Sequence, residues 1–230
     1  MGIALTLSVV GLVAGAFANS VALDTSVEAA AANAPSGGLY AVRSLRLPLI
    51  QIVTGALFAT TPLVVGVSWT LPAYLWFVWL TVTLMITDLD SKLIPNRILF
   101  PGTAVGAVLL VLGALFDGQP EAIVRAVGGG IASFLVLYVV ARLARGDFGL
   151  GDVKLALLLG MFTAYQGWEE LVVGLFAAFI LGGVVSIVLL VTGSRHRKDS
   201  IPFGPFLVAG AYLALTWGSD IASWYTATSP

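Results

Sequence analysis

Long apolar runs, separated by short polar breaks, are the main pattern along this chain. A helix needs about 20 mostly apolar residues to cross a bilayer, with a range of about 17–25, and most of these runs fall within it. The pattern therefore predicts eight membrane helices. They are Ile3–Leu23, Leu47–Val67, Leu71–Thr87, Ile98–Phe116, Ala122–Leu143, Val153–Tyr165, Leu171–Thr192 and Phe203–Trp217. The sixth run is the shortest, so we expect it to cross only part of the bilayer or to start deeper than the others.

The composition supports a membrane protein and excludes a water-soluble one. Of the 230 residues, 59% are hydrophobic and only 10% are charged, and the mean hydropathy is +1.01. A soluble domain is nearer 45–50% apolar and about 25% charged. We expect an all-α, polytopic integral membrane protein, with residues 1–230 forming one membrane-embedded domain among lipids. Only Met1 and Gly2 precede the first run, so we expect that run to be retained rather than cleaved as a signal peptide.

Charge and residue usage exclude several chemistries. The net charge of -1 and eleven basic residues give no basic face for nucleic acid. The chain has no cysteine, which excludes disulfides, thiolate metal sites and a cysteine nucleophile. Its one histidine, His196, lies in a basic run, and no HExxH motif is present. We expect no metal and no cofactor.

The basic residues predict an orientation. If the N-terminus lies outside, ten of the eleven basic residues fall at the inner side and only Arg125 lies toward the other, as the positive-inside rule requires. Both termini are then outside. The one long polar segment, which contains AAAANAPSGG, lies at the inner side. It predicts a short, flexible cytosolic loop over residues 24–46.

Two acidic segments at the inner edge carry the candidate chemistry. Asp88 closes the third run, and Asp152 opens the sixth after Gly149 and Gly151. Two carboxylates about 3 Å apart share a proton, so one can activate water while the other protonates a carbonyl oxygen. This is peptide hydrolysis without a metal. The competing interpretations are that Asp152 only stabilises a helix N-terminus and that Asp88 is a solvated acid at the interface.

Other functional assignments are weaker. Asp90 and Asp147 are also acidic and lie close to the candidates in sequence, but we assign neither of them the primary catalytic role. Asp90 is expected to face water. Lys154 is a candidate base, although such a lysine more often extends toward lipid headgroups. A carrier that couples transport to ions or protons through paired acids is the alternative function. The position of Asp88 and Asp152 at the inner edge, rather than at mid-membrane, favours a protease.

These residues together resemble bacterial type IV prepilin leader peptidases, which are GxGD-type aspartic proteases. The chain shows an Asp seven residues before a Pro, at Asp88 and Pro95, the run Gly149-Leu150-Gly151-Asp152-Val153-Lys154-Leu155, and the run Ile201-Pro202-Phe203-Gly204-Pro205-Phe206. The resemblance implies the GxGD aspartic protease fold, with Asp88 and Asp152 as catalytic residues. The residues expected to support the site are Gly149, Gly151, Lys154, Pro95, Pro202 and Gly204.

The resemblance also implies a substrate and a location. Such enzymes remove the basic leader of type IV prepilins or pseudopilins at the cytoplasmic face of the bacterial inner membrane. Many also methylate the new N-terminus with S-adenosylmethionine, using a cytosolic loop with paired CxxC motifs. Segment 24–46 is short and cysteine-free, so we expect no methyl transfer. Presenilin-like enzymes share GxGD but carry YD and PAL motifs, whereas here Thr87 precedes the Asp and IPFGP follows.

Overall fold

The structure is a computed structural model that describes the backbone of residues 2–30, 39–91, 94–144, 149–192 and 202–228. Within these ranges the chain forms eight α-helices and no strand. The helices are α1 (Gly2–Ala30), α2 (Leu39–Val65), α3 (Leu71–Ser91), α4 (Asn96–Phe116), α5 (Pro120–Leu143), α6 (Leu150–Gln166), α7 (Trp168–Val191) and α8 (Gly204–Thr228). The all-α prediction is confirmed, and each predicted run corresponds to one helix.

The helices differ from the predicted runs mainly at their ends. Helix α1 continues to Ala30 and α2 begins at Leu39, so helical backbone occupies both ends of the segment 24–46 that we expected as a loop. No Gly or Pro interrupts residues 24–30, so nothing in the sequence stops α1 where the apolar run ends. Helix α8 likewise continues to Thr228. Four helices in the described part, α3, α4, α5 and α7, are long and apolar enough to cross a membrane.

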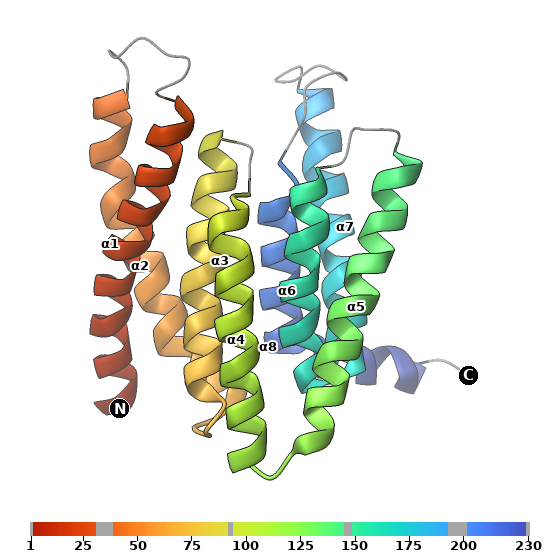
Figure 1. Cartoon of the computed structure of the whole chain (residues 1–230). Helices are drawn as coiled ribbons and strands as arrows, with labels where there is room; N and C mark the ends of the chain where they lie inside the picture. The colour runs from red at the N-terminus through yellow and green to blue at the C-terminus, as the bar shows by residue number, and fades with distance from the viewer. Residues whose placement is uncertain (1, 31–38, 92–93, 145–148, 193–201, 229–230) are drawn as a thin grey trace. The chain divides into compact units, whose positions relative to one another are not determined.

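The chain divides into two compact units, Met1–Gly118 and Gln119–Pro230. The first unit contains α1–α4, and α3 contacts each of the other three helices (Figure 1). The second contains α5–α8, and α6 contacts each of its three neighbours (Figure 1). Helices α3 and α6 are therefore central to their own units. About two thirds of the apolar span of α3 is buried (67%).

Small residues allow the helices to approach closely within each unit. A Cβ added at Gly11 of α1 would lie 2.8 Å from the Cα of Gly55 on α2, so only a glycine allows this close approach of the two helices. In the second unit, a Cβ at Gly129 of α5 would overlap Ala164 of α6, and one at Gly160 would overlap the hydroxyl of Ser133. Helix contacts made by small residues are typical of membrane bundles, where helix association depends on close packing.

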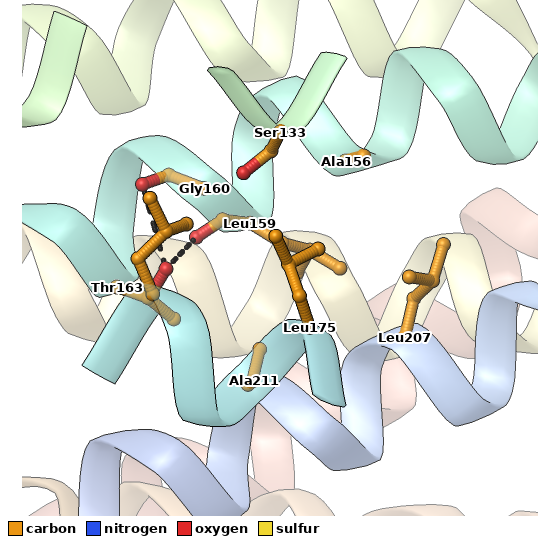
Figure 2. A pocket seen from close by; sticks show the side chains of 10 residues that line it. Ser133, Ala156, Leu159, Gly160, Thr163, Leu175, Leu207 and Ala211 are labelled. Atoms are coloured by element: carbon orange, nitrogen blue, oxygen red, sulfur yellow. Dashed lines mark hydrogen bonds between the residues drawn. The ribbon is translucent and has the colours of Figure 1, made fainter. Parts of the chain in front are cut away.

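A small pocket with about 10 Å³ of free space lies among α5–α8. Ser133 of α5 faces the turn of α6 that carries Gly160 and Thr163 (Figure 2). The hydroxyl of Thr163 donates to the carbonyl oxygen of Leu159 at 2.9 Å, whereas the buried Ser133 Oγ has no hydrogen-bond partner among the described residues. The space is near the minimum for one water molecule.

One acidic side chain holds an end of the first unit together. The carboxylate of Asp117, after α4, accepts hydrogen bonds from the backbone N–H groups of Trp69 (3.0 Å) and Thr70 (3.1 Å) and from the Thr70 hydroxyl (3.2 Å). These groups immediately precede α3, where free N–H groups favour a negative charge. Asp117 therefore fixes the start of α3 to the end of α4.

Candidate active site

Asp88 lies near the C-terminal end of α3, at the end of the unit where α4 begins (Figure 1). Its side chain is only 4% exposed. The residue before it, Thr87, is also buried and donates to the carbonyl oxygen of Leu84 at 2.8 Å. Thr83 satisfies its hydroxyl in the same way. This face of α3 thus places polar groups inside the unit and satisfies the hydroxyls within the helix, as an apolar surrounding requires.

Pro95 sets the start of the next helix. It is the N-cap of α4, with φ -72° and ψ 122°, and the N–H groups of Ile98 and Leu99 donate to its carbonyl oxygen. Proline fixes φ near this value, and its missing N–H is not needed at a helix start. Ile94 is buried just before it. The connection after Asp88 is therefore anchored at Pro95, while the side chain of Asp90 lies outside the described residues.

Asp152 lies in the first turn of α6 and is 7% exposed. Its N–H donates to the carbonyl oxygen of Gly149, the N-cap, at 3.1 Å. A Cβ added at Gly149 would lie 3.1 Å from Oδ2 of Asp152. Gly149 has φ -71° and ψ 131°, which any residue can adopt. The glycine is therefore suited to this position because a side chain there would crowd the carboxylate, and not because the backbone is unusual.

The other two residues expected to support Asp152 lie on the same first turns of α6. Gly151 and Lys154 are both half-buried. The structure thus brings Gly149, Gly151, Asp152 and Lys154 together on one helix end. Their individual roles stay predictions.

The start of α8 is held by aromatic packing against α7. Phe203 lies between Pro202, which is half-buried, and Gly204, which is buried. Its ring lies 5.4 Å from that of Phe179 on α7, and a Cβ added at Gly182 would come within 2.7 Å of Phe203 Cε2. Gly182 was not identified from the sequence, where it is one glycine within an apolar run. In this structure it makes room for the ring that anchors the beginning of α8.

The candidate residues fall into two groups. Asp88 and Pro95 belong to the first unit. The second unit carries the α6 group and, at the same end of that unit, the start of α8 with Pro202 and Gly204 (Figure 1). Asp147, to which the sequence assigned no primary catalytic role, lies outside the described residues, as does His196. Among the described residues, no three His, Asp or Glu side chains gather as a metal site requires.

Buried carboxyl groups in a membrane protein indicate function. An uncompensated charge is costly away from water, so such acids are paired, protonated or used in chemistry. Asp88 and Asp152 are the only two acidic residues among the described side chains that are buried. A carboxyl pair can exchange a proton and so supply both a general base and a general acid.

Comparison with known proteins decides the family. The chain is 30% identical over 185 residues to the prepilin leader peptidase/N-methyltransferase of Bacillus subtilis (strain 168), covering 79% of this chain and 70% of that protein. The chain belongs to the type IV leader peptidase family. The model of that family matches residues 75–187, a range that includes both Asp88 and Asp152. The predicted family is therefore confirmed.

Two further leader peptidase relatives show the extent of the match. The chain is 33% identical over 198 residues to the prepilin leader peptidase/N-methyltransferase of Aeromonas salmonicida (strain A449). This alignment covers 83% of this chain and 65% of that protein. For the Aeromonas hydrophila protein of the same name the identity is 32% over 193 residues, covering 82% of this chain and 64% of the relative. This chain thus spans slightly less than two thirds of both Aeromonas relatives. No solved structure matches the chain.

Proposed function

We propose that this protein is an aspartic endopeptidase that removes the leader peptide from type IV prepilins or pseudopilins. The observation that supports it most directly is that the segment matched by the leader peptidase family contains the two buried acidic side chains, Asp88 and Asp152. Relatives that match most of this chain are named prepilin leader peptidase/N-methyltransferase.

In the proposed reaction the two carboxyl groups divide the work of hydrolysis. One carboxylate takes a proton from water, and the water oxygen forms a bond to the carbonyl carbon of the scissile peptide. The other, protonated, carboxyl donates its proton to the carbonyl oxygen. When the C–N bond then breaks, the nitrogen receives a proton from the carboxyl that had taken one, and a hydroxyl group of the tetrahedral intermediate returns a proton to the other carboxylate as the carbonyl re-forms. The leader is released as a carboxylic acid, which ionises in water. The products are a free leader carboxylate and the new N-terminal amine, and the pair returns to its starting state.

Single substitutions test these roles. Asp88→Asn and Asp152→Asn should each lower cleavage of a synthetic prepilin peptide by roughly 100-fold or more, because an amide cannot serve as general base. Both variants should remain in the membrane fraction. Asp90→Asn is the matched control, two residues from Asp88, and should keep substantial activity. A dead Asp90→Asn enzyme with an active Asp88→Asn enzyme would overturn the assignment, and ion uptake by proteoliposomes without any cleavage would favour a carrier instead.

The proposed orientation places this chemistry at the cytoplasmic side of the inner membrane. Its support is the sequence distribution of Lys and Arg, which concentrates on one side of the helices. The cysteine-free chain makes a direct test possible, since His196→Cys introduces the sole thiol. A membrane-impermeant maleimide should not label this thiol in intact cells and should label it in inverted membranes. Labelling in intact cells contradicts the orientation.

We also propose that the enzyme cleaves without methylating. The chain has no cysteine that could hold a small metal-stabilised cytosolic domain. Helical backbone at Gly2–Ala30 and from Leu39 onward leaves few residues between α1 and α2. Mass spectrometry of pilin processed with this enzyme as the only peptidase provides the test. An unmodified new N-terminus is expected, and a product heavier by one methyl group overturns this part of the proposal.

A further inference from the structure

An apolar groove of about 830 Å³ lies between the first half of α7 and the last turns of α8. Figure 1 shows that the last turns of α8 bend away from the axis of its first part, near the start of α7. Val172, Phe176 and Ile180 line the groove from α7 and are exposed, Phe176 by 66%. Ile221, Trp224 and Tyr225 line it from α8 and are exposed as well. The groove belongs entirely to the second unit.

The shape of the groove suits a flexible hydrocarbon chain. Val172, Phe176 and Ile180 are spaced four residues apart, so they form one stripe along α7 about 12 Å long at 1.5 Å per residue. Trp168 lies at the N-terminal end of the stripe, and Trp224 of α8 also lines the groove. Tryptophan prefers the membrane interface, where its ring is apolar and its N–H can reach polar groups. The groove thus has an interfacial end and an apolar end, like a phospholipid.

The charges at the interfacial end are acidic. Glu169 lines the groove, and Glu170 packs against Gly218 of α8. Asp220, two residues after Gly218, is exposed. Helices α7 and α8 carry no Lys, Arg or His. On α5, the guanidinium group of Arg125 donates to the carbonyl oxygen of Tyr165 at 3.0 Å. The N-terminal dipole of α7 offsets part of this negative charge, but the side chains at this end attract an ammonium group and repel a headgroup with a net negative charge.

We propose that this groove binds one phospholipid of the surrounding bilayer whose headgroup carries an amine, as in phosphatidylethanolamine. One acyl chain follows the stripe Val172–Ile180, and the ammonium group lies at Glu169. A second copy of this protein is a poorer occupant, because two such faces would bring their acidic ends close to each other. Anionic phosphatidylglycerol is a poorer occupant for the same electrostatic reason. The proposal concerns lipid binding alone and does not depend on peptidase activity.

Native mass spectrometry of the full-length protein in detergent tests the site. The protein is stripped of lipid and titrated with phosphatidylethanolamine and phosphatidylglycerol that carry identical acyl chains. The wild type should bind the amine-bearing lipid roughly threefold or more tightly, the effect expected of a partly exposed charge pair. Glu169→Gln should remove most of this preference. Glu121→Gln, which removes a first-turn acid from α5 outside the groove, should leave the preference unchanged.

Filling the groove provides an independent test. Ala177→Phe on α7 and Ala222→Phe on α8 each place a ring in the groove, and both should weaken binding of either lipid at least several-fold. Because the two variants lie on different helices, a folding defect in one still leaves the other informative, and unfolding temperature is measured for both. Equal affinity of the wild type for the two lipids, unchanged binding in a folded groove-filled variant, or lipid-free dimers in place of lipid-bound monomers would each overturn the proposal.

Discussion

Helices α6 and α7 are consecutive, joined only by Gly167, and both are rich in apolar residues, yet they lie in opposite surroundings. Twelve of the 17 residues of α6 are buried. Only four of the 24 residues of α7 are buried, namely Leu171, Gly174, Ala178 and Gly182, which form one narrow face. Within a bilayer, apolar character does not tell a central helix from a peripheral one. Packing by small residues makes that distinction.

The difference in burial also distinguishes the helices that carry the two candidate acids from the helices around them. Asp152 lies on the central helix α6, and Asp88 lies on α3, whose apolar span is 67% buried compared with 33% for α4 and 22% for α7. The peripheral helices instead carry exposed apolar stripes. Protein-lined positions can satisfy a polar group, whereas a lipid-facing position cannot. The proposed chemistry is therefore expected on the helices whose surface is mostly covered by other helices.

The largest difference between α6 and α7 should appear when a side chain is added to a glycine of each. Gly160→Leu forces atoms into Ser133 and α5 and should lower the free energy of unfolding by about 3 kcal/mol or prevent folding, because overpacking a tight contact is costly. Gly183→Leu on α7 meets nothing within 4 Å and should change stability little. Thermal unfolding in detergent measures both. Equal stability of the two variants would contradict the packing difference.

Gly149→Ala should separate positioning of the carboxylate from stability. The added methyl group would crowd Oδ2 of Asp152, which lies 3.1 Å from the Cβ position, while the backbone conformation tolerates alanine. We expect kcat for prepilin peptide to fall by about tenfold or more, since small displacements of a reacting group are costly, with KM and unfolding temperature little changed. Leu150→Ala, which alters the exposed neighbouring side chain, serves as the control. Unchanged kcat in Gly149→Ala would contradict this explanation of the glycine.

Gly182→Ala should show that α7 affects the candidate site through its narrow buried face. The added methyl would displace the Phe203 ring by a few tenths of an ångström or more, since the Cβ position is 2.7 Å from Cε2. A several-fold fall in cleavage is expected. Gly183→Ala changes the adjacent glycine, which faces open space, and should keep full activity. If both variants match the wild type in a cleavage assay, the packing of Phe203 is not needed for activity.

The described residues form one helix for each of the eight predicted runs, because long apolar runs correspond directly to helices. The prediction that all eight cross the membrane stays a prediction, since four of them are long and apolar enough by themselves. The helix ends were less predictable, since polar residues such as those from Asp24 to Ala30 continue a helix without adding to hydropathy. The GxGD pattern indicated Asp152, and the structure adds a reason for its first glycine. The contacts of Gly182 and Asp117 could not be predicted, because each joins residues distant in sequence whose pairing only the packing specifies.

Ser133→Ala should give the smallest effect and indicates what fills the pocket beside α6. Removing a buried hydroxyl without a protein partner should leave stability unchanged or raise it by up to about 1 kcal/mol, because an unsatisfied polar group is costly. Equilibrium unfolding of the wild type and the variant measures the difference. A loss of about 1 kcal/mol or more would show instead that a bound water satisfies this hydroxyl.

The single-residue joint at Gly167 has a consequence for biogenesis. Helix α6 ends at Gln166 and α7 begins at Trp168, and α6 is not among the helices long and apolar enough to cross a membrane unaided. A nascent segment of this kind partitions poorly into lipid during synthesis. We therefore expect the insertion machinery to retain α6 until the strongly apolar α7 emerges from the ribosome, so that both leave the translocon as one hairpin.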